Sequence, residues 1–202
     1  MHSYLALGDS YTIGEGVHLS ETYPYQFVQL LREAGQPVYA PEIIARTGWT
    51  TDELATAIAH THLLPHYDIV SLLIGVNNQY RGRGLQEYGG QFEQLLDQAI
   101  GLTQPQGRVF VLSIPDWGVS PFAAAQEKDR SLIAKEIDSF NTLARQITQE
   151  KKLPFIDITG HSRTRLSPAN FTADGLHPDK DQYAEWARQL NKYYSAHPYS
   201  DR

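Results

Sequence analysis

Asp-Ile-Val-Ser-Leu-Leu-Ile, residues 68–74, is almost wholly apolar and contains three β-branched aliphatic residues, Ile69, Val70 and Ile74. That composition is typical of a strand in a parallel sheet, where helices bury both faces of the strand. Gly75 follows directly and ends the apolar run. The segment therefore predicts a central strand of a parallel sheet, and the rest of the chain can be placed around it.

Short apolar runs alternate with longer amphipathic stretches on both sides of residues 68–74. The amphipathic stretches carry apolar residues at helical spacing, whereas the short runs suit strands. Further strands are expected at 4–7, 37–45, 108–114 and 154–158, and helices at 23–34, about 51–62, 85–102, about 126–151 and 179–196. Strands that alternate with helices predict an α/β protein, a three-layer α/β/α sandwich around a parallel sheet. Because no linker rich in Pro, Gly or Ser divides residues 1–202, we expect a single domain.

The composition narrows the classes of function. Hydrophobic residues make up 41% and charged residues 20%, which is enough apolar content for a folded core. The net charge of −6 disfavours a nucleic acid or an anionic membrane as a partner held by bulk electrostatics. Cysteine is absent, which excludes disulfides, thiolate metal sites and a Cys nucleophile. No segment approaches the roughly 20 apolar residues of an integral membrane span. We therefore expect a cytoplasmic protein.

Polar residues gather directly after the expected strands. Ligands of open α/β sheets bind beyond the carboxyl ends of the strands. These positions hold Gly8-Asp9-Ser10-Tyr11, residues 46–50, residues 75–78, residues 115–117 and, at some distance from the last strand, residues 174–178. The sequence thus places its most informative residues where this fold would place a site.

The chemistry at these positions is that of a serine nucleophile. A Ser hydroxyl needs a base to take its proton, and His177 is a candidate base for Ser10. Asp174, three residues earlier, can hold the imidazole in the required tautomer. The backbone N–H groups of Ser10 and Gly48 and the side-chain amide of Asn77 are suitable oxyanion donors. Each residue also has an ordinary structural explanation as a helix cap or turn residue.

Taken together, these segments resemble the GDSL, or SGNH, hydrolase superfamily. The matching stretches are Gly8-Asp9-Ser10 with Tyr11, the Gly48 loop, Gly75-Val76-Asn77 and Asp174-Gly175-Leu176-His177-Pro178. They occur in the family's order and span almost the whole chain. The resemblance implies a flavodoxin-like, five-stranded parallel sheet of order 2-1-3-4-5. It also implies Ser10 as nucleophile and oxyanion donor, Gly48 and Asn77 as further donors, His177 as base and Asp174 as its partner.

One position departs from the family's pattern, and two loops are candidates for the substrate pocket. Asn78 stands where the family usually has Asp, which removes a charge and leaves the donor Asn77 in place. Residues 78–84 either meet an anionic or sugar-like leaving group or form a solvated loop. Residues 117–125 are apolar and either line the acyl pocket as a mobile lid or pack under the sheet edge. Asn78, Trp117 and Phe122 are the candidate pocket residues.

These observations predict a carboxylic-ester hydrolase that acts through an acyl-enzyme on Ser10. The expected partner is a small-molecule ester: a short-chain ester, a lysophospholipid or an acetylated sugar. An acyl or acetyl transferase with the same triad is an alternative, and a catalytically silent ligand-binding protein on this fold is an alternative of another class. No cofactor is expected, because the chain lacks Gly-x-Gly-x-x-Gly, and no metal, because His60, His62 and His66 do not share one helix face.

Overall fold

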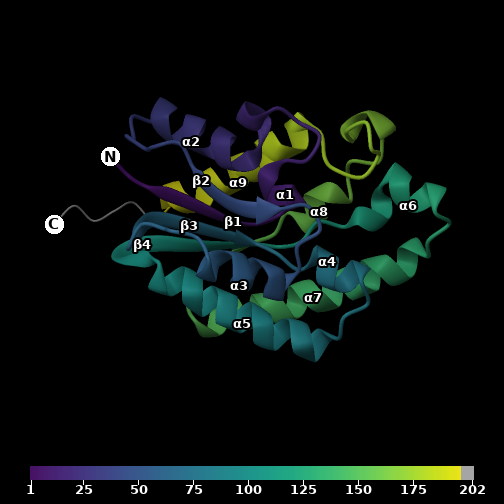
Figure 1. The fold of residues 1–202 in the computed structure, drawn as a ribbon. Coiled ribbons are helices and arrows are strands. Elements are labelled where there is room, and N and C mark those ends of the chain that lie inside the picture. The colour runs from purple at the N-terminus through teal and green to yellow at the C-terminus, as the bar shows by residue number, and fades with distance from the viewer. Residues whose placement is uncertain (197–202) are drawn as a thin grey trace.

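The computed structural model describes residues 1–196, which form a five-stranded parallel sheet between two layers of helices (Figure 1). The strands are β1 (Tyr4–Asp9), β2 (Glu42–Arg46), β3 (Tyr67–Leu73), β4 (Thr103–Leu112) and β5 (Phe155–Ile156). Their order in the sheet is β2-β1-β3-β4-β5, and every neighbouring pair is parallel. The expected α/β sandwich and the strand order 2-1-3-4-5 are confirmed.

The helices divide between the two faces of the sheet. Helices α2 and α9 lie side by side on one face, and α3, α5 and α7 cover the other (Figure 1). The helices are α1 (Ser10–Ile13), α2 (Tyr23–Glu33), α3 (Thr51–Ala59), α4 (Val76–Tyr80), α5 (Leu85–Gly101), α6 (Pro121–Ala125), α7 (Arg130–Glu150), α8 (Thr159–Ser162) and α9 (Lys180–Ala196), with 3-10 turns η1 (Leu19–Glu21), η2 (Trp117–Val119) and η3 (Pro168–Asn170). In residues 1–196, no helix is long and apolar enough to cross a bilayer.

The central strands are buried as their composition predicts. Every residue of β1 is buried, and β3 is buried at all positions except Asp68. Ser71 is the polar exception within the apolar run, and its Oγ lies 2.8 Å from the Tyr4 hydroxyl and 3.2 Å from the Tyr23 hydroxyl. A buried hydroxyl without a partner costs about 1–3 kcal/mol, so these two tyrosines make a serine tolerable in the core.

The segment between β4 and α7 is more ordered than the sequence predicts. A single helix was expected from about residue 126, but α7 begins at Arg130, because the Asp129 carboxylate caps the N–H groups of its first turn at 3.0 Å. A separate helix, α6, begins at Pro121, where the Ser120 hydroxyl accepts a hydrogen bond from Ala123 N–H at 3.1 Å. The apolar connection therefore contains both η2 and α6.

The two outer strands are shorter or displaced. Pairing of β2 with β1 begins at Glu42 rather than near residue 37, and β5 consists of Phe155–Ile156 alone. Both strands lie at sheet edges, where only one neighbour supplies hydrogen bonds. These shifts leave the carboxyl ends of the parallel strands on the same side of the sheet. The loops that follow β1, β2, β3 and β4 therefore meet there.

Candidate active site

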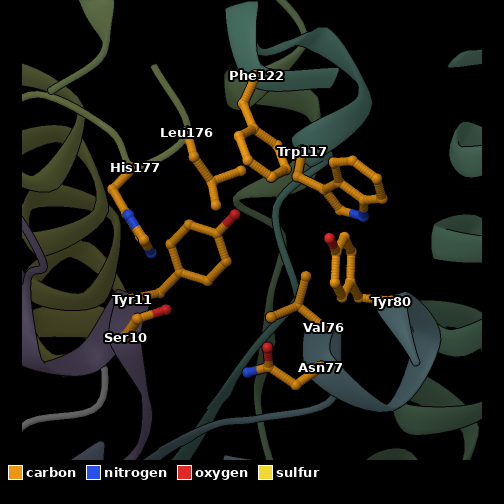
Figure 2. A pocket seen from close by; sticks show the side chains of 9 residues that line it. All are labelled: Ser10, Tyr11, Val76, Asn77, Tyr80, Trp117, Phe122, Leu176 and His177. Carbon is orange, nitrogen blue, oxygen red and sulfur yellow. The ribbon is translucent and has the colours of Figure 1, made fainter. Parts of the chain in front are cut away.

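Ser10 lies where β1 ends and α1 begins. The carboxylate of Asp9, the last residue of β1, accepts a hydrogen bond from Tyr11 N–H at 3.0 Å and fixes this turn. As the first residue of α1, Ser10 has a backbone N–H with no acceptor inside its own helix. The Ser10 side chain is 5% exposed and lines a cavity (Figure 2). A bound molecule could therefore reach its hydroxyl.

Asp174 and His177 form a compact unit in the loop before α9. Asp174 Oδ2 lies 2.6 Å from His177 Nδ1. Asp174 Oδ1 accepts hydrogen bonds from the N–H groups of Leu176 and His177 at 2.8 and 3.0 Å, and from the Thr172 hydroxyl at 2.8 Å. One carboxylate thus shapes the turn with one oxygen and orients the imidazole with the other.

These contacts stabilise the ionised form of Asp174. Partial burial acts to raise the pKa of Asp174, but the hydrogen bonds from the His177 ring and from the surrounding N–H and O–H groups outweigh it. The pKa is therefore held well below its usual range. An ionised carboxylate next to Nδ1 favours the tautomer with the proton on Nδ1, which leaves Nε2 as the basic nitrogen.

His177 and Ser10 line the same cavity from two different loops. Tyr11 also lines this cavity, and its ring packs edge to face against the His177 ring, with centroids 5.5 Å apart and planes at 61° (Figure 2). In residues 1–196, no hydrogen bond joins Ser10 Oγ to the imidazole. Bonds between a nucleophile and its base are often long without substrate and tighten when substrate binds.

Asn77 and Gly48 belong to two segments that are bonded to each other. Asn77, in α4, lines the cavity, and its Nδ2 donates to the Trp49 carbonyl at 2.9 Å. One of the two amide protons is used there, which leaves the other for a ligand. Gly48 precedes Trp49 and has a φ of +85°, in the left-handed region that favours glycine. The bond from Asn77 thus joins the Gly48 loop to a cavity-lining residue, although Gly48 itself does not line the cavity.

The cavity beside Ser10 has a volume of about 170 Å³. Its walls away from Ser10, His177 and Asn77 are mostly apolar: Tyr11, Val76, Tyr80, Trp117, Phe122 and Leu176. The Tyr80 and Trp117 rings meet edge to face at 5.2 Å, and both face the interior in Figure 2. Trp117 and Phe122 therefore lie where the sequence predicts them. Tyr80 and Leu176 were missed as pocket residues, although each lies close to a motif in the chain.

Asn78 does not line this cavity, which corrects its assignment to the pocket. Its side chain is fully buried and faces the start of α3. Asn78 Oδ1 accepts a hydrogen bond from Thr51 N–H at 3.1 Å, and Asn78 Nδ2 donates to Thr51 Oγ1 at 2.7 Å. Neighbouring residues of a helix point in different directions, so Asn77 faces the cavity while Asn78 ties α4 to α3.

The two arginines of the loop after α4 are engaged by acidic residues of the protein. Arg81 pairs with Glu53 at 3.2 Å, and Arg83 pairs with Asp52 at 2.6 Å and with Glu87 at 3.4 Å. Neither arginine lines the cavity beside Ser10. This arrangement argues against an arginine site for an anionic leaving group, but residues 78–84 are not simply a solvated loop either, because residues 78–80 belong to α4 and Tyr80 lines the cavity.

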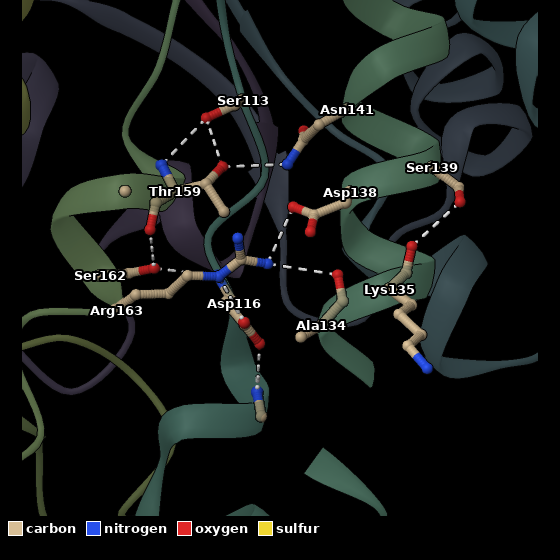
Figure 3. A network of polar contacts seen from close by, with 12 residues as sticks. Ser113, Asp116, Ala134, Lys135, Asp138, Ser139, Asn141, Thr159, Ser162 and Arg163 are labelled. Carbon is tan, nitrogen blue, oxygen red and sulfur yellow. Dashed lines mark hydrogen bonds and ion pairs between the residues drawn. The ribbon is translucent and has the colours of Figure 1, made fainter. Parts of the chain in front are cut away.

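Trp117 is fixed from two sides. Its indole N–H donates to Gln79 Oε1 at 2.7 Å, and Gln79 Nε2 donates to Glu136 Oε2 at 2.6 Å. The preceding residue, Asp116, is held by a buried polar network (Figure 3) in which Arg163 Nε donates to its Oδ2 at 2.8 Å. The indole is therefore a fixed wall of the cavity.

The α6 segment also contacts the turn that carries His177. Phe122 N–H donates to the Gly175 carbonyl at 2.9 Å. This backbone bond joins the apolar connection to the Asp174–His177 unit. A movement of residues 117–125 as a lid stays a prediction, and it would have to break this bond.

Asp9 is buried directly beneath the turn that presents Ser10. Its Oδ1 accepts from Tyr11 N–H, but its buried Oδ2 has no hydrogen-bond partner in the described part of the chain. Burial raises the pKa of Asp9 to about 7, and the hydrogen bond from Tyr11 only partly opposes this effect. Asp9 therefore caps the turn before Ser10, and its ionised form destabilises the folded protein.

The arrangement can perform nucleophilic chemistry with protein groups. It brings together a serine hydroxyl, an oriented imidazole, an amide donor and an apolar cavity. Within residues 1–196, no group of three or more His, Asp or Glu side chains is placed to hold a metal ion.

Comparisons with known proteins identify the family and the fold. The family described as GDSL-like Lipase/Acylhydrolase matches residues 6–185. A variant of Axe2, an acetyl xylan esterase from Geobacillus stearothermophilus, shares 19% identity over 95% of this chain and 93% of its own, with a TM-score of 0.74. A lipase/acylhydrolase from Enterococcus faecalis shares 17% identity over 100% of both chains, with a TM-score of 0.77. TesA shares 15% identity over 93% of this chain and 95% of its own, with a TM-score of 0.68. At these identities the solved structures establish the fold. No curated protein matches the chain.

Proposed function

Because the chain belongs to the GDSL-like lipase/acylhydrolase family and is a hydrolase of ester bonds, we propose that it cleaves carboxylic esters through an acyl-enzyme on Ser10. The observation that carries this proposal is the Asp174–His177 pair, joined at 2.6 Å, on the cavity that Ser10 also lines. A nucleophile, a base and a group that orients the base are the parts that acyl transfer to serine requires.

In the first half-reaction, Ser10 Oγ attacks the ester carbonyl carbon while His177 Nε2 takes the hydroxyl proton. The resulting imidazolium is stabilised by the Asp174 carboxylate at Nδ1. The tetrahedral intermediate then collapses: the bond to the alkoxy oxygen breaks, and His177 returns its proton to the departing alcohol. The product is an acyl group bound to Ser10 Oγ and one molecule of alcohol.

In the second half-reaction, water replaces the alcohol. His177 takes a proton from water, whose oxygen attacks the acyl carbon, and the proton then returns to Ser10 Oγ as the carboxylic acid leaves. An acyl transferase would use a second alcohol at this step. Both half-reactions pass through an oxyanion, for which we assign the N–H groups of Ser10 and Gly48 and the free amide proton of Asn77 as donors.

The size and lining of the cavity favour short acyl groups. A cavity of 150 Å³ lined by apolar side chains can hold benzene, so about 170 Å³ suits an acyl group of up to about six carbons. Short-chain esters and acetylated sugars meet this limit, and the fold neighbour Axe2 is an acetyl xylan esterase. The longer acyl chain of a lysophospholipid would extend beyond the cavity. We therefore propose a short-chain ester as the substrate class.

A panel of nitrophenyl esters from acetate to decanoate tests this proposal, with Ser10→Ala as the control. We expect the highest kcat/KM at or below six carbons and no turnover above background with Ser10→Ala. Hydrolysis by Ser10→Ala at the wild-type rate would contradict the mechanism, and a preference for decanoate would contradict the substrate class. Product analysis with added glycerol distinguishes hydrolysis, which releases free acid, from transfer, which forms a glycerol ester.

A further inference from the structure

Arg81 connects the helix that carries Asn77 to the loop that carries Gly48. It follows α4 directly, and its Nη2 donates a hydrogen bond to the Gly48 carbonyl oxygen at 2.6 Å. Its Nη1 lies 3.2 Å from Glu53 Oε1. The guanidinium therefore bridges the Gly48 loop and the first turn of α3.

The backbone of the Gly48 loop makes one turn-closing hydrogen bond, from Trp49 N–H to the Arg46 carbonyl at 3.2 Å, which leaves the Gly48 carbonyl to be held by Arg81. Gly48 has a φ of +85°, and glycine is the residue that most readily changes conformation. The Gly48 N–H has no partner among the hydrogen bonds of residues 1–196, as expected for a donor kept for a ligand. Its carbonyl, in contrast, is held on the side of the loop that faces Arg81.

A second bond joins the same two segments at the next residue. Asn77 Nδ2 donates to the Trp49 carbonyl at 2.9 Å. The carbonyls of Gly48 and Trp49 are thus both bound by side chains from α4 or its end. Because the two bonds act on consecutive peptide groups, they fix the loop relative to Asn77.

We propose that Arg81 is a positioning residue of the oxyanion hole: by binding the Gly48 carbonyl it holds the loop so that the Gly48 N–H, in the preceding peptide group, and the Asn77 amide converge on one oxygen. This inference rests on the proposed function. Both printed bonds of the Arg81 guanidinium go to protein acceptors, the Gly48 carbonyl and Glu53, so we assign Arg81 to the loop and not to the substrate. Its effect is on the geometry of the donors, which matters most in the transition state, when the negative charge develops.

The fork of the guanidinium explains why arginine suits this position. Nη1 and Nη2 point to two different acceptors, Glu53 and the Gly48 carbonyl, in one rigid plane. A lysine ammonium can reach one of these acceptors but cannot hold both in a fixed relation. The pair with Glu53 is about 40% exposed on both sides, so its loss costs little stability.

Arg83 is a matched control on the same loop. It also pairs with an acidic residue in the first turn of α3, Asp52, but it makes no bond to the Gly48 loop. Both alanine variants remove one positive charge from the same region; Arg81→Ala removes one ion pair and Arg83→Ala removes two. A difference between them therefore reports the bond to the Gly48 carbonyl.

The test measures kcat and KM for a nitrophenyl ester and the rate constant for phosphonylation of Ser10 by a fluorophosphonate. For Arg81→Ala we expect kcat to fall by about 10- to 100-fold, less than the 10²- to 10³-fold typical when a donor is removed outright. KM should change by less than about twofold, and the phosphonylation rate should fall with kcat. Arg81→Lys should recover part of the loss, and Arg83→Ala should stay within about twofold of wild type.

Two results would overturn the inference. One is an Arg81→Ala kcat equal to that of Arg83→Ala. The other is a loss that appears in KM alone, which would make Arg81 a binding residue. If Arg81→Ala folds poorly, Arg81→Lys provides the test. A wild-type kcat in that variant would show that the two-pronged guanidinium is not needed to position the Gly48 loop. Failure of the proposed function is a separate result, since it appears as ester hydrolysis that survives Ser10→Ala in the wild-type background.

Discussion

Asp174 binds His177 twice: its Oδ2 lies 2.6 Å from the ring Nδ1, and its Oδ1 accepts the backbone N–H of the same residue at 3.0 Å. A spacing of three residues makes this possible, because both bonds close within one turn. The side chain of Asp174 is 43% exposed, whereas that of His177 is 7% exposed. The base is therefore buried in the cavity wall and is oriented by a carboxylate that faces solvent.

Asp174→Asn should separate the two tasks of the carboxylate. The amide oxygen can still accept from the Leu176 and His177 N–H groups, so the turn should stay folded. The amide NH₂ would then face His177 Nδ1 and force Nδ1 to act as an acceptor, which places the proton on Nε2. We expect kcat to fall by about 10²- to 10⁴-fold with a melting temperature within a few degrees of wild type. A kcat close to wild type would show that Asp174 only shapes the turn.

The two adjacent asparagines of α4 should respond differently to alanine substitution. Asn77→Ala removes a proposed oxyanion donor at the cavity, so we expect kcat to fall by about 10²- to 10³-fold with little change in stability. Asn78→Ala leaves the buried Thr51 N–H and hydroxyl without these partners, so we expect a loss of about 1–3 kcal/mol in the free energy of unfolding. Ester kinetics and urea denaturation on both variants check this contrast, and the reverse pattern would refute the assignment.

Trp117→Ala should lengthen the preferred acyl chain. The substitution removes the indole that closes one wall of the cavity. Each methylene that enters an apolar cavity contributes about 0.8 kcal/mol, which is roughly fourfold in kcat/KM. We expect the ratio of kcat/KM for octanoate over butyrate to rise by about tenfold. Tyr39→Ala, an exposed tyrosine outside the cavity lining, serves as the control. An unchanged chain-length preference in Trp117→Ala would show that the acyl group does not bind against Trp117.

Asp9 should make the protein less stable as the pH rises. The folded protein keeps the Asp9 proton up to a pKa of about 7, whereas the unfolded chain loses it near 3.8. Between these values the unfolded chain binds fewer protons, so the free energy of unfolding falls with increasing pH. The cost is fully present above pH 7 and is on the order of 4 kcal/mol.

Asp9→Asn keeps an acceptor for the Tyr11 N–H but has no proton to lose. The difference in free energy of unfolding between Asp9→Asn and wild type should therefore grow between pH 4 and pH 7 in favour of the variant. Urea denaturation at several pH values measures this difference. A difference that stays constant with pH would mean that the Asp9 carboxyl is not held protonated in the folded state.

The sequence was sufficient for the sheet and for the residues around Ser10. The apolar run at 68–74 and its counterparts predict the strands, and the polar turns after them predict where Ser10, Asn77 and His177 lie. These features depend on local pattern, because burial on both faces and position after a strand leave a signature in the chain. The strand order itself came from the resemblance to a family and is confirmed by the structure.

The missed features depend on contacts between distant segments. The start of α7 is an exception, because the Asp129 carboxylate that caps it binds N–H groups only two and three residues later. The burial of Asn78 depends on Thr51, which is 27 residues earlier in the chain. The role of Arg81 depends on Gly48, 33 residues earlier. In the sequence, the segment around Arg81 has only the pattern of an ordinary polar turn. No local pattern specifies which of two adjacent asparagines faces the cavity.

Covalent trapping of the nucleophile tests the central claim most directly. The protein is treated with a fluorophosphonate, which transfers its phosphonyl group to a reactive serine oxygen and releases fluoride, and the modified residue is identified by peptide mass spectrometry. We predict one adduct, on Ser10, that forms in proportion to the loss of ester hydrolysis and is absent from Ser10→Ala and strongly slowed in His177→Ala. Loss of hydrolysis with the adduct on a different residue, or full hydrolysis by a protein whose Ser10 is modified, would contradict the account.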